Sequence, residues 1–106
     1  MAELMDITDF DWDKTVMESS IPVVVEFYAQ WCGPCRQLSP VLESIADEHS
    51  DVRFVKMDVD YNRETAHRYS VLSVPTMMTF VNGKVKNTVV GAKPKTVLAR
   101  NLLSGV

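Results

Sequence analysis

The chain alternates between dense apolar runs and stretches in which apolar residues recur at helical spacing. The run IPVVVEFYA (21–29) is mostly β-branched and aromatic, which is typical of a strand buried on both faces. VRFVKMDVD (52–60) has a similar pattern, and TMMTFVNGKVKNTVVG (76–91) predicts two strands joined at Asn82-Gly83, a strong hairpin signal. A short strand is expected before these, near residues 4–7.

Helical patterns fill the intervals between the strands. Thr8, followed three residues later by Asp11, indicates a capped helix, and Asn62 stands where it can cap another. These caps predict helices over about 9–19 and 62–69. The helical spacing of apolar residues predicts a helix over about 32–49 and a last helix after Pro94.

This order of elements predicts an α/β fold with one mixed sheet of about five strands flanked by four helices. Strands separated by helices pair in parallel, whereas the hairpin adds an antiparallel edge. A chain of 106 residues can form one core but is too short for two, so we expect a single domain over 1–106.

Composition narrows the class of protein. No apolar run approaches the ~20 residues that span a bilayer, so no membrane partner is expected. The acidic start MAELMDITDFDWD lacks the basic and apolar segments of a signal peptide, which favours a cytoplasmic protein over a mature form whose leader has been removed. A net charge of −3 without a basic, aromatic strip argues against nucleic-acid binding.

Charge is divided unevenly along the chain. Residues 1–64 carry all 14 acidic side chains and five basic ones, whereas residues 65–106 carry six basic side chains and no acidic one. Most of these charges are expected to be solvated surface groups, but such a polarised chain can also create a field that steers partners.

The candidate chemistry lies in YAQWCGPCRQLSP (28–40), which contains both cysteines of the chain. The segment follows a buried strand and opens a helix, and reaction sites of α/β sheets gather at that edge. The helix start favours a thiolate at Cys32, and Cys35 lies three residues on, close enough for a disulfide. Pro34 is tolerated in a first helical turn and stiffens the loop. This geometry predicts an exposed nucleophile at Cys32 and an inward-facing resolving thiol at Cys35.

Two other uses of the cysteines are weaker. A structural disulfide closing only four residues would constrain the unfolded chain little. For zinc, His49 falls at a finger-like distance from Cys35, but His67 is too far along and the chain has no other cysteine. A redox function is therefore favoured over a staple or a metal site.

These motifs resemble the thioredoxin family over essentially the whole chain. The resemblance is carried by VVVEFYAQWCGPCRQLSP, VKMDVD, SVPT, FVNGK and VGA, in the family's order and near its spacing. It implies a protein-disulfide reductase in which Cys32 forms a mixed disulfide and Cys35 resolves it. It also implies a monomer without a bound cofactor or metal, recycled by a thioredoxin reductase that draws on NADPH through a flavin. Its substrates would be disulfide-containing proteins.

The resemblance also suggests roles for residues outside the motif. Pro75 matches the family's cis proline facing the dithiol, and Lys56 matches a lysine near the buried acid. Glu26 stands where the family usually has aspartate, and we expect it to exchange a proton with Cys35, with a purely structural Glu26–Lys56 pair as the alternative. Tyr28 replaces a more common tryptophan and is expected to pack, with a partner for its hydroxyl if buried.

Substrate contacts are expected around Cys32 on an apolar, nearly flat patch with a basic rim. Such a patch suits extended segments of many partners, because backbone pairing is indifferent to sequence. By resemblance the patch comprises Trp31, Gly33, Pro34, Val74, Pro75, Gly91 and Ala92, and its rim would contain Arg36, Lys93 and Lys95.

Two other functions remain open at this point. One is a disulfide oxidase or isomerase of the same fold, although Gly-Pro between the cysteines resembles the reducing members. The other is a non-enzymatic binding subunit, against which the presence of both cysteines argues.

Overall fold

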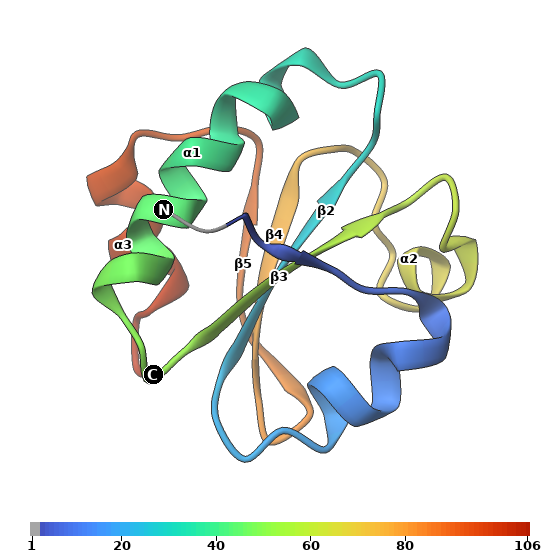
Figure 1. The fold of residues 1–106 in the computed structure, drawn as a ribbon, viewed down its shortest axis with the longest axis horizontal. Coiled ribbons are helices and arrows are strands. Elements are labelled where there is room, and N and C mark those ends of the chain that lie inside the picture. The colour runs from blue at the N-terminus through green and yellow to red at the C-terminus, as the bar shows by residue number, and fades with distance from the viewer. Residues whose placement is uncertain (1–2) are drawn as a thin grey trace.

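A computed structural model describes residues 3–106, and its sheet separates two layers of helices (Figure 1). The elements follow in the order β1 (Met5–Asp6), η1 (Asp9–Asp11), η2 (Asp13–Met17), β2 (Val23–Tyr28), α1 (Gly33–Glu48), β3 (Arg53–Asp58), α2 (Arg63–Arg68), β4 (Thr76–Val81), β5 (Lys84–Val90) and α3 (Lys95–Leu102). Here η1 is a 3-10 helix and η2 a π-helix.

The mixed sheet predicted from the sequence is confirmed. Within residues 3–106 its five strands are ordered β1-β3-β2-β4-β5, with β1 and β2 parallel to β3. β4 runs antiparallel to β2, and β5 runs antiparallel to β4. The hairpin turn at Asn82-Gly83 has positive φ at both residues, 52° and 77°, as a two-residue turn of this twist requires.

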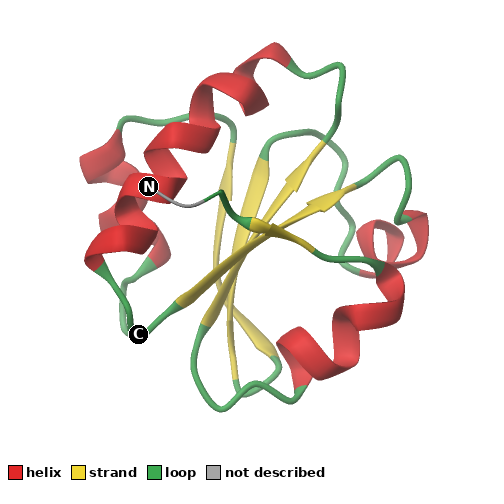
Figure 2. Ribbon diagram, viewed as in Figure 1, coloured by secondary structure: helices red, strands yellow, loops and turns green. Residues whose placement is uncertain are grey.

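Helices cover both faces of the sheet (Figure 2). On one face, α1 and α3 bury Leu42 and Leu98 against Val24 of the central strand β2. On the other, Trp12 and Val16 pack against Val25. All six residues of β2 are buried, which explains the nearly continuous apolar run at this place in the sequence.

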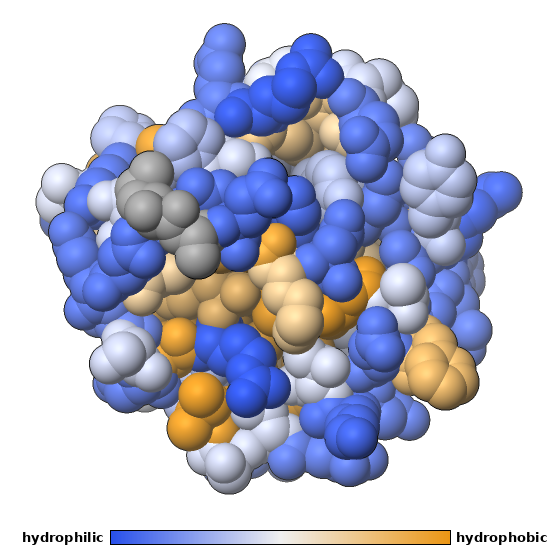
Figure 3. Space-filling view, in the orientation of Figure 1, coloured by the Kyte–Doolittle hydropathy of each residue, from blue (hydrophilic) through white to orange (hydrophobic). Residues whose placement is uncertain are grey.

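The outer surface in the same orientation is mainly hydrophilic, and its apolar areas are interrupted by hydrophilic side chains (Figure 3). In the part of the chain that the structure describes, no helix has the length and apolar character needed to cross a membrane.

The helix expected over 9–19 forms as two short irregular turns, η1 and η2. Its start is as predicted, because Thr8 donates its backbone N–H and its hydroxyl to Asp11 Oδ2, at 3.2 and 3.0 Å. A regular α-helix does not follow. Trp12 and Val16 are both fully buried, and core packing rather than helix propensity determines such a short segment.

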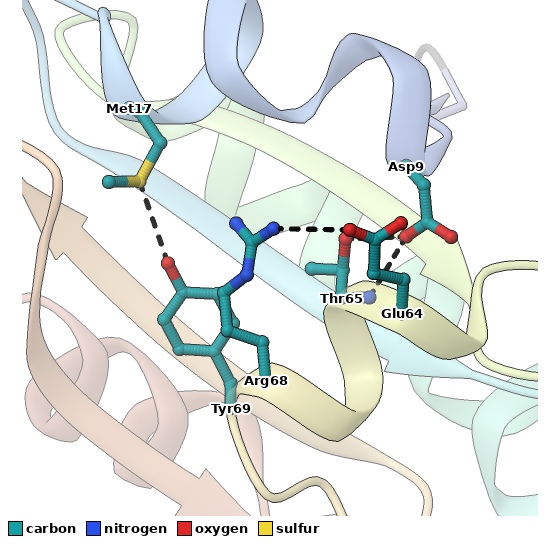
Figure 4. A network of polar contacts seen from close by, with 6 residues as sticks. All are labelled: Asp9, Met17, Glu64, Thr65, Arg68 and Tyr69. Atoms are coloured by element: carbon teal, nitrogen blue, oxygen red, sulfur yellow. Dashed lines mark hydrogen bonds and ion pairs between the residues drawn. The ribbon is translucent and has the colours of Figure 1, made fainter.

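The expectation that Asn62 caps α2 with its own side chain is wrong. Asn62 Nδ2 donates to Asp58 O at 3.0 Å, and its Oδ1 accepts from Asp9 N at 2.8 Å. The cap comes instead from Asp9, whose Oδ1 accepts from the backbone N–H of Thr65 at 3.0 Å and also from the Thr65 hydroxyl (Figure 4). A residue over fifty positions away thus accepts a hydrogen bond from a backbone N–H that has no partner within the first turn of α2.

Asp9→Ala is expected to lower the free energy of unfolding by about 2 kcal/mol, because it removes a helix cap and leaves polar groups of Thr65 unpaired. Asp9→Asn should recover part of the loss, since its amide oxygen can accept the same bonds. Glu64→Ala is the matched control: it breaks only the exposed Glu64–Arg68 pair at 3.5 Å and should change stability by less than about 0.5 kcal/mol. Urea unfolding measures all three. Equal losses for Asp9→Ala and Glu64→Ala would contradict the capping role.

Candidate active site

The two cysteines lie where β2 ends and α1 begins. Cys32 is the N-cap residue of α1, Cys35 lies in its first turn, and the two are joined as a disulfide with their Cα atoms 5.3 Å apart. The backbone N–H of Cys35 donates to Cys32 Sγ at 3.2 Å. The sulfur of Cys32 therefore occupies the position of a capping acceptor at the N-terminus of a 16-residue helix.

This location favours negative charge on Cys32 once the disulfide is reduced. The unpaired N–H groups and the positive end of the helix dipole both stabilise an anion there. The first turn of α1 contains no acidic residue that would oppose it. A thiolate at Cys32 would thus be formed more readily than in an unstructured peptide.

The expectation of an exposed Cys32 is wrong for this disulfide-bonded form. Cys32 is only 3% exposed and Cys35 only 2%, because both pack with Tyr28 and Ala29 in a small apolar cluster. The space beside Gly33, the next residue, is open: an added side chain there would meet no atom within 4 Å other than those of its chain neighbours. Another chain can therefore approach the backbone closely at Gly33.

Segments distant in sequence meet beside this cluster. The Val74-Pro75 peptide bond is cis, and Val74 packs against the apolar cluster that contains both cysteines. Gly91 N donates to Pro75 O at 2.8 Å. The start of β4 and the end of β5 are therefore held together next to the disulfide, while Pro34 and Ala92 are exposed.

Trp31 forms one side of the site. Its side chain is 70% exposed, and its indole N–H donates to Asp60 Oδ2 at 2.9 Å. The ring borders a pocket of about 110 Å³, whose other lining residues are Val59, Val71, Leu72, Ser73 and Val74.

The structure separates the three residues expected in the basic rim. Lys93 is exposed, and its ammonium lies 3.8 Å from where a Cβ of Gly91 would be. Arg36 is also exposed and donates from Nη1 to Gln30 O at 2.7 Å. Lys95, by contrast, is held by Glu48 at 2.8 Å and Ser44 at 2.7 Å, on the half of α1 away from the disulfide. Its ammonium does not belong to the rim.

Glu26 is buried in the centre of the sheet. It is 1% exposed, and its Oε2 has no hydrogen-bond partner among the described residues. Burial raises the pKa of this carboxyl to about 7, an effect partly opposed by Lys56 and reinforced by Glu43 and Asp6. Glu26 can therefore change its protonation state near neutral pH.

Lys56 is the register neighbour of Glu26 on β3, but no ion pair joins them within residues 3–106. Its ammonium lies 5.2 Å from the centroid of the Tyr28 ring instead. The Tyr28 hydroxyl donates to Asp6 Oδ2 at 2.6 Å. Sequence reasoning indicated that a buried Tyr28 needs a partner but could not identify Asp6, which is 22 positions earlier.

A pocket of about 290 Å³ reaches Cys35 but not Cys32. Cys35, Lys56 and Tyr28 line it together, so the Cys35 sulfur and the Lys56 ammonium share one cavity. Its remaining lining residues are Asp6, Ala29, Gln30, Arg36 and Ser39.

Metal binding is not supported by the arrangement of donor side chains. Nowhere in the described part of the chain do three or more His, Cys, Asp or Glu side chains gather in a way that could hold an ion.

Comparisons with known proteins agree with this geometry. The family model described as Thioredoxin matches residues 3–104. The chain is 50% identical over 97 residues to "Thioredoxin 1" of Synechococcus elongatus, covering 91% of each chain. It is 45% identical over 100 residues to "Thioredoxin" of Haemophilus influenzae, covering 93% of this chain and 94% of the relative. "Thioredoxin M-type, chloroplastic" of Brassica napus is 39% identical over 97 residues, which are 91% of this chain and 55% of that protein.

Proposed function

The chain belongs to the thioredoxin family, and on this premise we propose which step of disulfide exchange each of its site residues carries out. It is a protein-disulfide oxidoreductase that reduces disulfides by reversible exchange at Cys32 and Cys35, without a bound cofactor. The observation that carries this conclusion is the Cys32–Cys35 disulfide at the start of α1, with the N–H of Cys35 directed at Cys32 Sγ. Insulin reduction followed by turbidity tests it.

Cys32 is the nucleophile in this proposal. Its thiolate attacks one sulfur of a substrate disulfide, forming a Cys32–substrate bond and releasing the other substrate sulfur as a thiolate that takes a proton from water. Cys35 then loses its proton and attacks Cys32 Sγ, which breaks the mixed disulfide and releases the second substrate sulfur as a thiolate that takes a proton in turn. Two electrons pass to the substrate, and the protein is left with its Cys32–Cys35 disulfide.

We propose Glu26 as the group that accepts the proton of Cys35. The period-two alternation of β2 places Glu26 on the same face as Val24, which packs against α1, and Tyr28, which packs against Cys35. Its pKa of about 7 suits a group that must both take and return a proton near neutral pH. Lys56 would tune that carboxyl from the neighbouring strand.

Glu26→Gln is expected to slow substrate turnover by at least about tenfold and to remove the bend in the rate near pH 7. Steady-state reduction of insulin between pH 5 and 9 measures it. Glu18→Gln, an exposed acid with the same chemical change, is the control. An unaltered pH profile in Glu26→Gln would contradict the acid–base role.

Substrates are proposed to lie across Gly33 and along Val74, with Pro75 facing the dithiol. Open space at Gly33 and the packing of Val74 against the cysteine cluster support this placement. Pro75 cannot donate a backbone hydrogen bond, but the free backbone of Val74 can pair with an extended segment. The rest of the proposed contact surface comprises Trp31, Pro34, Gly91 and Ala92.

The rim charges Lys93 and Arg36 would favour substrates with acidic groups near their disulfide. Lys93→Glu should raise KM for such a protein about threefold or more at low salt, and the difference should shrink in 0.5 M NaCl. Lys84→Glu makes the same charge change at the opposite end of β5 and serves as the control. Equal effects of the two substitutions would contradict a local role for Lys93.

We further propose that a flavin-containing thioredoxin reductase restores the dithiol with electrons from NADPH. Family membership supports a reductase partner and disulfide-containing substrates. Catalytic oxidation of NADPH in a mixture of reductase, this protein and insulin tests the proposal. The potential measured against glutathione separates a reductant from an oxidase or isomerase.

The cytoplasm is the compartment we propose, with residues 1–106 acting as a single monomeric domain. Bacterial relatives that match along nearly their whole length support this assignment, although plant relatives are named as chloroplastic. Fractionation of cells that produce the protein, together with size-exclusion chromatography, tests it.

A further inference from the structure

Three charged side chains stand in one row across the sheet. The register pairs Asp6 of β1 with Lys56 of β3, and Lys56 with Glu26 of β2. Residues paired between neighbouring strands point to the same face, here the face covered by α1. The row therefore reads carboxylate, ammonium, carboxyl, and Lys56 is placed to pair with either acid.

Neither pairing is formed. In the described part of the chain, the ion pairs within 4.0 Å are Glu64–Arg68 and Glu48–Lys95, far from this row. Lys56 turns toward the next residue on that face of β2, Tyr28, with its ammonium 5.2 Å from the ring centroid. Asp6 also contacts Tyr28, because its Oδ2 accepts a hydrogen bond from the Tyr28 hydroxyl at 2.6 Å.

One tyrosine thus holds both charged neighbours of Glu26. Its ring offers the ammonium a cation–π contact, and its hydroxyl offers the carboxylate a charge-assisted hydrogen bond. The side chain is only 9% exposed and packs beside Cys32 and Cys35, so its position is determined by the same cluster as the dithiol.

As a result, the Oε2 atom of the buried Glu26 has no hydrogen-bond partner among the described residues. Its neighbours Lys56 and Tyr28 line the pocket that reaches Cys35. Besides Lys56 and Asp6, the charged group that acts on its pKa is Glu43 from α1, which is acidic. Asp58 at the end of β3, also acidic, acts on the neighbouring Tyr28. Lys56 is therefore the positive group that could hold Glu26 in its ionised form.

We propose that Tyr28 is a positioning residue that keeps the Lys56 ammonium from forming an ion pair with the Glu26 carboxyl, so that Glu26 retains enough affinity for a proton to take one from Cys35. This rests on the proposed acid–base role of Glu26. Tyr28 touches the cysteine cluster but exchanges no proton itself, because burial and its hydrogen bond to Asp6 raise the pKa of the phenol far above neutral pH.

The electrostatic consequence has a definite sign. An ammonium that moves within about 4–6 Å of a carboxylate lowers the pKa of that carboxyl by about 1–3 units. Tyr28→Leu removes both ring and hydroxyl, so Lys56 is freed to approach Glu26. Glu26 should then titrate at least about one pH unit lower, a tenfold increase in its acid dissociation constant.

A double-mutant cycle on the titration of Glu26 tests the proposal. The carboxyl is followed by carbon-13 NMR and assigned by its loss in Glu26→Gln. Tyr28→Leu is compared with the parent, once in the natural chain and once in a Lys56→Met background. Tyr28→Phe keeps the ring, so it should shift the titration midpoint of Glu26 by less than half as much as Tyr28→Leu does. If Tyr28→Leu does not fold, Tyr28→Met fills similar space without a ring and takes its place.

The proposal requires a downward shift in the natural chain that disappears in the Lys56→Met background. A shift that persists without Lys56 would mean that Tyr28 acts by excluding water, and no shift in either background would mean that it does not act on Glu26; both overturn the proposal. The cycle is independent of catalysis. If Glu26→Gln turns over at the parental rate, the acid–base role fails, while the titration still reports whether Tyr28 positions Lys56.

Discussion

Cys35→Ser is expected to stop turnover, by about a thousandfold or more, while leaving the first chemical step intact. Cys32 can still attack a substrate disulfide from the N-terminus of α1, where its sulfur is the capping acceptor. Without the sulfur of Cys35, nothing within the protein breaks the mixed disulfide. A stable covalent adduct of protein and substrate should therefore accumulate in stoichiometric amount, as measured by mass spectrometry beside the insulin assay.

Cys32→Ser is the matched variant for this experiment. It should lose turnover equally and form no stable adduct, because only Cys32 occupies the N-cap position of α1, where the helix start favours a thiolate, and Cys35 does not. The opposite pattern, with an adduct on Cys35 and none on Cys32, would reverse the assigned roles.

Glu26→Gln should also change how stability depends on pH, by about 3 kcal/mol between pH 4 and pH 8. The pKa of Glu26 is raised in the folded protein from 4.5 to about 7, so the folded state holds a proton that the unfolded state has released over that interval. The free energy of unfolding contributed by this group therefore falls as pH rises from 4.5 to about 7. The glutamine variant lacks this loss, so it gains stability relative to the parent as pH rises.

Denaturant unfolding of the disulfide-bonded protein at pH 4 and pH 8 measures this difference. Glu18→Gln, in which the acid is exposed, should follow the parental pH dependence. If Glu26→Gln loses stability between pH 4 and pH 8 by the same amount as the parent, the carboxyl is not held protonated by burial.

The sequence carried most of the information on the sheet and the position of the dithiol. A strand buried on both faces needs mostly apolar residues, so the run VVVEFY was sufficient to predict β2. Asn82-Gly83 is a strong signal for a two-residue hairpin turn, because both residues tolerate positive φ. The placement of Cys32 at a helix start followed from the apolar strand before it and the helical spacing after it.

The features that sequence reasoning missed are side-chain contacts between distant segments. The cap of α2 by Asp9, the hydrogen bond of Tyr28 to Asp6 and the capture of Lys95 by Glu48 depend on which strands and helices become neighbours. Local spacing does not encode such contacts. The burial of Cys32 was missed for the same reason, because Val59 and Val74, which pack against it, arrive from other elements.

Asp9 also limits how the protein can be shortened or fused for practical use. Through Asn62 and Asp58 its hydrogen bonds continue to Asp60, and Asp60 in turn holds the indole of Trp31. A variant that lacks residue 9, or a tag that pulls this segment away, would weaken the hydrogen bonds that position Trp31 beside the active site. Neither change would alter a cysteine. Immobilisation through the C-terminal end, after α3, avoids that interference.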